Sequence, residues 1–155
     1  MSVAPRALAA IATWLAACLA IVQTARRRYA LVTVRGPSMS PTLVHGDWVL
    51  VDRSRRPRRG DVVALRLPLA ARDAWRDLEV SDVDLRLPKW VIKRAVAVGG
   101  DTTPGRPAGA DRVPAGHVFV LGDNDRSMDS RHWGPVAEAV VLGVATRRVS
   151  SGPSE

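Results

Sequence analysis

A serine held between two prolines is the first residue of this sequence that could do chemistry. Ser38 lies in the segment 36–43 (GPSMSPTL), directly after the apolar run 30–34. Pro37 and Pro41 fix their own φ angles and bias the preceding residues toward extended geometry, which stiffens the backbone around Ser38. A rigidly held serine is suited to be a nucleophile, because little ordering entropy remains to be lost in the reaction. The alternative is a proline-rich turn whose serines bond only to the backbone.

Lys93 is the second candidate, because this sequence uses lysine so sparingly. Lys89 and Lys93 are the two lysines among 23 basic residues. A desolvated ammonium can lose its proton, whereas a guanidinium cannot. In the run 90–98, strand alternation places Lys93 on the face of Ala95 and Arg94 on the other face. Desolvation there would lower the pKa of Lys93 and supply the neutral amine that a general base needs. A lysine that reaches solvent from a strand edge is the alternative, and Lys89 is expected to be solvated.

Short polar side chains are concentrated in a third region, residues 122–136 (GDNDRSMDSRHWGPV). They could form an ordinary loop of Asx and Ser turns, in which Asp129 and Arg131 could pair. A Ser-His-Asp triad lacks the Gly-x-Ser-x-Gly elbow and would have to draw on His45, His117 or His132. A metal site lacks a zinc or calcium spacing and would have to use Asp123, Asp125, Asp129 and His132. We expect His117 simply to begin a strand.

An apolar segment without formal charge, residues 7–25, precedes the candidate residues. As a helix it would be about as long as a bilayer core is thick. A membrane anchor, a cleaved signal peptide and a buried or interfacial helix are the three interpretations. Three arginines at 26–28 follow the segment directly, which is unusual beside a cleavage site and favours the anchor. The same arginines would place the globular part in the cytoplasm by the positive-inside rule.

From Tyr29 onward the pattern changes to short apolar runs between Gly, Pro and Asp, which predicts strands. The runs cover residues 29–34, 48–51, 62–67, 90–98, 118–121 and 140–149. This predicts a mainly β fold, a compact sandwich or partly open barrel. We expect 68–88 to be a loop with a helical turn and 102–114 to be a long turn. The predicted organisation is a membrane anchor with a basic flank at 1–28, a β-rich domain at 29–149 and a solvated tail at 150–155.

The formal net charge of +8 suggests an anionic neighbour such as phospholipid or nucleic acid. Much of the excess lies in two clusters, at 26–28 and 53–59, which fit loops beside a headgroup layer better than a continuous nucleic-acid track. The single cysteine, Cys18, lies in the apolar segment, so an intrachain disulfide is impossible.

Taken together, the three regions resemble the type I signal peptidase family, whose members are membrane-anchored proteases with a Ser-Lys dyad. The matching stretches, in family order, are 38–43 (SMSPTL), 46–51 (GDWVLV), 93–101 (KRAVAVGGD) and 122–134 (GDNDRSMDSRHWG). The resemblance implies a mainly β catalytic core that needs no cofactor or metal. It implies Ser38 as nucleophile and oxyanion donor, Lys93 as general base and Ser127 as the residue that orients the lysine. It also implies a structural ion pair between Asp129 and Arg131, with Gly122, Asp123 and Asn124 beside the site.

The resemblance also suggests substrates and location. Larger relatives insert a second β-domain before the Gly-Asp-Asn stretch, whereas only 102–120 stand there here, as in mitochondrial inner-membrane peptidases and small maturation proteases. We expect a single-pass membrane protein with an extracytoplasmic catalytic domain that cleaves signal peptides from exported precursors. Small side chains before the cut would suit a shallow pocket beside Ala95 and Ala97. Many bacterial members carry a hydroxyl residue where this chain has Gly36, and Pro37 has no N–H, so a second oxyanion donor is not identified.

Three alternatives stay open at this point. A dedicated propeptide protease, such as the type that processes nickel superoxide dismutase, could work with a cytoplasmic core. An inactive anchored β-module could bind peptides. A self-cleaving repressor of the LexA type also uses Ser-Lys chemistry, but the first 35 residues contain an apolar segment where a DNA-binding domain should be.

Overall fold

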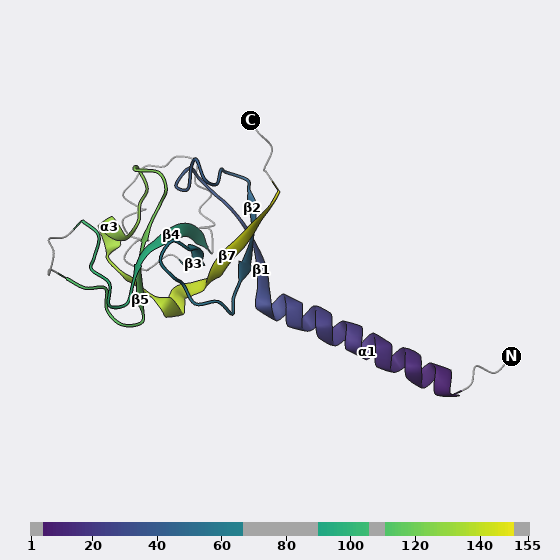
Figure 1. Cartoon of the computed structure of the whole chain (residues 1–155). Coiled ribbons are helices and arrows are strands. Elements are labelled where there is room, and N and C mark those ends of the chain that lie inside the picture. Colours follow the sequence, from purple (N-terminus) through teal and green to yellow (C-terminus); the bar gives the residue numbers. More distant parts are fainter. Residues whose placement is uncertain (1–4, 67–89, 106–110, 151–155) are drawn as a thin grey trace.

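The computed structural model of this chain describes residues 5–66, 90–105 and 111–150 (Figure 1). Helix α1 (Pro5–Arg28) runs directly into strand β1 (Tyr29–Thr33) and projects away from the sheet as one straight rod (Figure 1). Its segment Ala9–Arg28 has a mean hydropathy of 1.4, and none of that segment is buried against the rest of the chain. Twenty helical residues span about 30 Å, the thickness of a hydrocarbon core. The helix is therefore long and apolar enough to cross a membrane.

Seven strands form one curled antiparallel sheet, which confirms the mainly β prediction (Figure 1). Their order is β1-β2-β7-β3-β4-β5-β6, so the strand that comes last in the sequence lies inside the sheet, between β2 and β3. After β1 the strands are β2 (Trp48–Asp52), β3 (Val62–Leu65), β4 (Val91–Val98), β5 (His117–Leu121), β6 (Val136–Ala137) and β7 (Val141–Ser150). Each of the six predicted strands is present, with ends shifted by no more than two residues.

Three short elements were not predicted: strand β6, helix α3 (Ser130–Trp133) and the 3-10 turn η1 (Glu138–Val140). They are two to four residues long, too short for hydrophobic periodicity to indicate them. The predicted loop at 68–88 lies outside the described residues. Of the long turn predicted at 102–114, the described part contains a bridge between Thr102 and Arg112.

Aliphatic side chains build the core on both faces of β3. Val63 packs in one cluster with Leu65 and Val120, and its neighbour Ala64 packs in another with Val49 and Val51. Consecutive strand residues point to opposite faces, so these two clusters lie on opposite sides of the sheet.

The loop between β1 and β2 covers the second cluster, because Met39 and Leu43 are buried in it. Backbone hydrogen bonds close this loop at its base, from Val34 N to Asp47 O at 2.8 Å and from Gly46 N to Val34 O at 2.9 Å. The segment that contains Ser38 is therefore fixed by packing as well as by its prolines.

Candidate active site

Ser38 lies in a turn that the core holds in place. The next residue, Met39, is fully buried, whereas Ser38 itself is half-buried. Ser40 N donates to Pro37 O at 3.0 Å, and Leu43 N donates to Met39 O at 2.9 Å. The turn thus presents a partly accessible serine on a backbone that these two hydrogen bonds hold in place.

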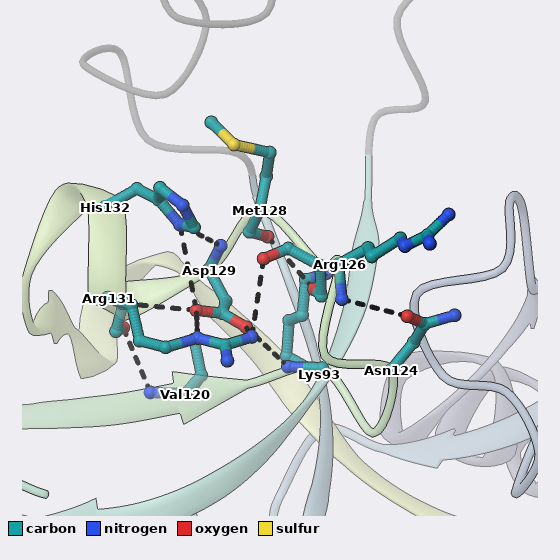
Figure 2. Close-up of polar contacts among 11 residues, drawn as sticks. Lys93, Val120, Asn124, Arg126, Met128, Asp129, Arg131 and His132 are labelled. Atoms are coloured by element: carbon teal, nitrogen blue, oxygen red, sulfur yellow. Dashed lines mark hydrogen bonds and ion pairs between the residues drawn. The ribbon is translucent and has the colours of Figure 1, made fainter. Parts of the chain in front are cut away.

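Lys93 lies in the middle of β4, opposite Val63 of β3, and only 1% of its surface is exposed. Its Nζ donates a hydrogen bond of 2.6 Å to Ser127 Oγ (Figure 2). Burial lowers the pKa of Lys93 to about 8 from 10.5; the charge of Asp129 opposes this shift and that of Arg131 adds to it. An amine with this pKa is neutral in a useful fraction of molecules near neutral pH, as a general base requires.

Gly122 brings the serine turn and the lysine's partner together. A Cβ added at Gly122 would collide with Ser127 Oγ and with the carbonyl oxygen of Ser38. The backbone also joins the two segments, because Asn124 N donates to Ser38 O at 3.2 Å. Ser38, Ser127 and, through Ser127, Lys93 therefore meet around a position where only glycine fits.

Asp129 organises the loop that presents Ser127. Its carboxylate is fully buried and accepts hydrogen bonds from Gly122 N at 2.9 Å and from Arg131 Nε and Nη2 at 2.9 and 2.8 Å (Figure 2). It also caps the N-terminus of α3. Burial alone would raise the pKa of Asp129, but the hydrogen bonds from Arg131 and Gly122 N lower it below its usual value. The carboxylate is thus kept ionised, and its charge is balanced mainly by its ion pair with Arg131.

A second ion pair, which the sequence interpretation missed, ties the same loop to β4. Arg94 donates from Nε and Nη2 to the two carboxylate oxygens of Asp123, at 2.8 and 2.6 Å. These hydrogen bonds lower the pKa of Asp123, and a hydrogen bond from the Thr42 side chain contributes in the same direction. Asp123 therefore connects the serine loop with the residue next to Lys93. The pairing of β4 with β5 explains this contact, because Arg94 lies opposite Leu121, two residues before Asp123.

The three histidines make their hydrogen bonds with backbone groups. His45 Nδ1 accepts from Gly36 N at 3.1 Å, His117 Nδ1 lies 3.0 Å from Ala115 O, and His132 Nδ1 accepts from Asp129 N at 3.4 Å (Figure 2). His117 is also the first residue of β5. His132 Nδ1 also lies 4.0 Å from a carboxylate oxygen of Asp129. None of these contacts involves the side chain of Ser38, which weighs against the Ser-His-Asp triad.

Ala95 and Ala97 offer almost no surface to a substrate, although Ala97 lies at the wall of a hollow beside Gly100 and Arg112. They are 0% and 1% exposed, and each packs in an apolar cluster, Ala95 with Val118 and Ala97 with Phe119. Strand alternation predicted both on the face of Lys93, but a register shift separates Ala95 from Ala97, and both side chains are almost fully buried. Their small size allows close packing around the amine instead.

Comparison with known proteins identifies the family. The profile of the family described as signal peptidase, peptidase S26, matches residues 7–106 and 102–150. The chain belongs to this family. One relative, mitochondrial ATP-independent inner membrane protease subunit 1a of Arabidopsis thaliana, is 38% identical over 137 residues, covering 79% of this chain and 72% of that protein. Another, signal peptidase I V of Bacillus subtilis, is 32% identical over 134 residues, covering 72% of this chain and 80% of that protein.

Mitochondrial inner membrane protease subunit 1 of Schizosaccharomyces pombe is 32% identical over 128 residues, covering 76% of this chain and 71% of that protein. These findings confirm the resemblance to the type I signal peptidases. The chain is a membrane-type serine endopeptidase of the signal peptidase family, and the comparisons favour neither the maturation protease nor the inactive module.

Gly122→Ala is expected to lower kcat by about 100-fold or more, because the added methyl must push Ser127 or Ser38 aside and a displacement of about 1 Å costs that much. Steady-state cleavage of a precursor peptide by the detergent-solubilised chain measures the effect. Gly99→Ala is the matched control: its methyl would lie 3.1 Å from Pro114 O, away from the site. A Gly122→Ala enzyme with the wild-type kcat would show that Gly122 does not hold these groups together.

Proposed function

We propose that this chain is a membrane-anchored signal peptidase in which Ser38 is the nucleophile and Lys93 the general base. One observation carries the proposal: a buried lysine amine with a pKa of about 8 is hydrogen-bonded to Ser127 beside the turn of Ser38. Proteolysis by a serine needs a group that removes the hydroxyl proton. The described hydrogen bonds of the histidines are with backbone groups and not with Ser38.

The proposed reaction begins when neutral Lys93 takes the proton from Ser38 Oγ as that oxygen attacks the scissile carbonyl carbon. The oxyanion accepts a hydrogen bond from the backbone N–H of Ser38. The protonated lysine then gives its proton to the departing amine, which leaves an acyl ester on Ser38. In the second half, the neutral lysine takes a proton from water, whose oxygen attacks the ester. The protonated lysine then returns that proton to Ser38 Oγ as the acid product leaves.

The surrounding residues act as positioning groups in this scheme. Ser127 accepts from the lysine Nζ, and its own hydroxyl lies within donating distance of Met128 O, at 3.3 Å. Asp129 holds the loop of Ser127 through Gly122 N and Arg131. Asp123, bound to Arg94, keeps the serine loop in register with β4.

For substrates, we propose precursor proteins with small residues before the cleavage site. The support is the family membership and the resemblance of the site segments, since Ala95 and Ala97 are buried and give no direct evidence. Mapping the cut sites in a set of precursors by mass spectrometry tests this preference, and cuts after large side chains would overturn it.

Ser38→Ala and Lys93→Met are each expected to reduce precursor cleavage by about 1000-fold or more, because each removes a group that takes part in bond making or proton transfer. The matched controls are Ser40→Ala, two residues further along the same turn, and Lys89→Met, the other lysine. Both controls should keep near wild-type rates. Wild-type cleavage by either Ser38→Ala or Lys93→Met would remove the dyad and favour the inactive-module alternative.

The pH dependence follows from the lowered pKa of Lys93. The base must be neutral, so kcat/KM should rise with pH, reach half its maximum near pH 8 and level off above it. At pH 6 only about 1% of the amine would be neutral, so kcat/KM should be about 100-fold below the plateau. A rate profile from pH 5.5 to 10 with one peptide substrate checks this. A profile that is flat below pH 8, or that rises only above pH 10, would contradict the role of Lys93.

We further propose that α1 crosses the membrane once and that the sheet lies outside the cytoplasm, where exported precursors emerge. The arginines at 26–28 oppose this orientation by the positive-inside rule, which describes a tendency that other signals override. A fusion at Glu155 is expected to give active alkaline phosphatase and non-fluorescent green fluorescent protein. The opposite pair of signals would place the sheet in the cytoplasm and support the propeptide protease.

A further inference from the structure

Two arginine clusters that are separate in the sequence meet where α1 joins the sheet. In the pairing of β1 with β2, Tyr29 lies opposite Asp52. The loop that follows β2 therefore starts beside the end of the helix, and Arg53 N donates to Arg28 O at 2.8 Å. We call the arginines of this junction the arginine collar; they are Arg26, Arg27, Arg28, Arg53, Arg55, Arg56, Arg58 and Arg59.

The collar contains most of the excess charge of the chain. Segments 26–28 and 52–61 together hold eight arginines and two aspartates, a net charge of +6 out of the formal +8. All eight arginines are exposed. Both aspartates already have partners: Asp52 lies 3.1 Å from Arg28, and Asp61 lies 3.7 Å from Arg55. The Ser54 hydroxyl and Arg28 lower the pKa of Asp52 to about 2, so this carboxylate stays charged.

The remaining charge is not balanced within the part of the chain that the structure describes. Among residues 5–66, 90–105 and 111–150, no carboxylate lies within 4.0 Å of the guanidinium groups of Arg53, Arg56, Arg58 or Arg59. Holding several like charges together at a surface is unfavourable unless an anion binds there. Within the described part of the chain these four arginines therefore have no carboxylate partner, and an anion bound beside them would be stabilised.

The position of the collar indicates where such an anion would come from. It adjoins the end of the segment Ala9–Arg28, the candidate membrane span, because Arg53 N donates to Arg28 O. If α1 spans the bilayer as proposed above, Arg28 lies at the hydrocarbon boundary, and the bond from Arg53 N keeps the loop within the headgroup layer. That layer is several Å thick and the screening length is about 8 Å in physiological salt, so the attraction of the headgroup charges for the collar is only partly screened.

The other end of the collar loop is bonded to the strand of Lys93. Gly60 N donates to Ala95 O at 2.7 Å, and Ala95 N donates to Asp61 O at 2.8 Å. Arg94, the partner of Asp123, donates to Gly60 O at 3.0 Å. A ligand that holds the loop would therefore also restrain β4, two residues from the catalytic amine.

We propose that the arginine collar binds the phosphates of anionic lipids in the leaflet at the C-terminal end of α1, and thereby seats the catalytic sheet on the membrane surface. This inference rests on the proposed membrane insertion of α1 and is independent of the assignment of Ser38 and Lys93. Lipid is favoured over nucleic acid because the collar adjoins the span, whereas the exposed loop offers no aromatic side chain for base stacking.

The test is amide hydrogen exchange of residues 53–61 in the full chain, reconstituted in nanodiscs of phosphatidylcholine with or without 30% phosphatidylglycerol. At 50 mM salt, phosphatidylglycerol is expected to slow exchange by about fivefold or more, since each arginine near an anionic surface contributes a factor on the order of five. Raising the salt to 0.5 M should abolish the protection, because it screens the headgroup charges. Equal exchange in the two lipid compositions would overturn the proposal.

Two matched variants distinguish an effect of the collar's own charge from an effect of the net charge of the chain. Replacing Arg53, Arg56, Arg58 and Arg59 by Gln should abolish the protection, whereas replacing Arg35, Arg66, Arg112 and Arg147 by Gln removes the same charge elsewhere and should leave it. Loss of protection in both variants would overturn the proposal, as would protection by a single-stranded oligonucleotide without protection by phosphatidylglycerol. The salt series uses the wild-type chain, so the proposal is testable even if a variant does not fold. Exchange does not depend on catalysis, so failure of the peptidase assignment would be seen separately.

Discussion

The structure depends on the burial of one amine. An ammonium removed from water is costly, and the protein lowers this cost by letting the pKa of Lys93 fall to about 8 rather than by pairing it with a carboxylate. Asp129 is near enough to raise that pKa, but its charge is committed to Arg131, whose own charge lowers it. A free carboxylate at the position of Asp129 would keep the lysine protonated. The ion pair therefore does more than fix a loop, because it also keeps the charge near the lysine close to neutral.

The other contacts of the site serve to hold neutral partners around this amine. Ser127 provides a hydroxyl, Gly122 provides the space for it, and the small residue Ala95 lets the neighbouring strand pack closely. Asp123 and Arg94 lie next to these groups and link the serine loop to β4 without placing a second charge on the lysine. Chemistry and folding thus depend on the same few hydrogen bonds.

The sequence allowed the strands and the helix to be predicted, and it singled out the residues that we propose as the site, for identifiable reasons. Gly, Pro and Asp separate the apolar runs clearly, and the scarcity of lysine drew attention to Lys93. The contacts that were not predicted depend on which residues lie opposite each other in paired strands. The bond of Arg94 with Asp123 depends on the register of β4 with β5, and the meeting of Arg53 with Arg28 depends on that of β1 with β2. Helix α3 escaped because it is a single turn, specified by the cap at Asp129 and not by periodicity. The burial of Ala97 was not predicted, because an alanine in a strand is equally compatible with a tightly packed core and with the wall of a pocket.

The position of β7 inside the sheet has a consequence for biosynthesis. The hairpin around Ser38 belongs to β1 and β2, and Lys93 belongs to the group that begins with β3, while β7 supplies the sheet hydrogen bonds between them. The ribosome makes β7 last, after all the other strands of this sheet. The sheet hydrogen bonds that join the two halves therefore form only after the last strand has been made. Loss of this strand would consequently remove the backbone hydrogen bonds that hold the hairpin of Ser38 beside the strands that carry Lys93.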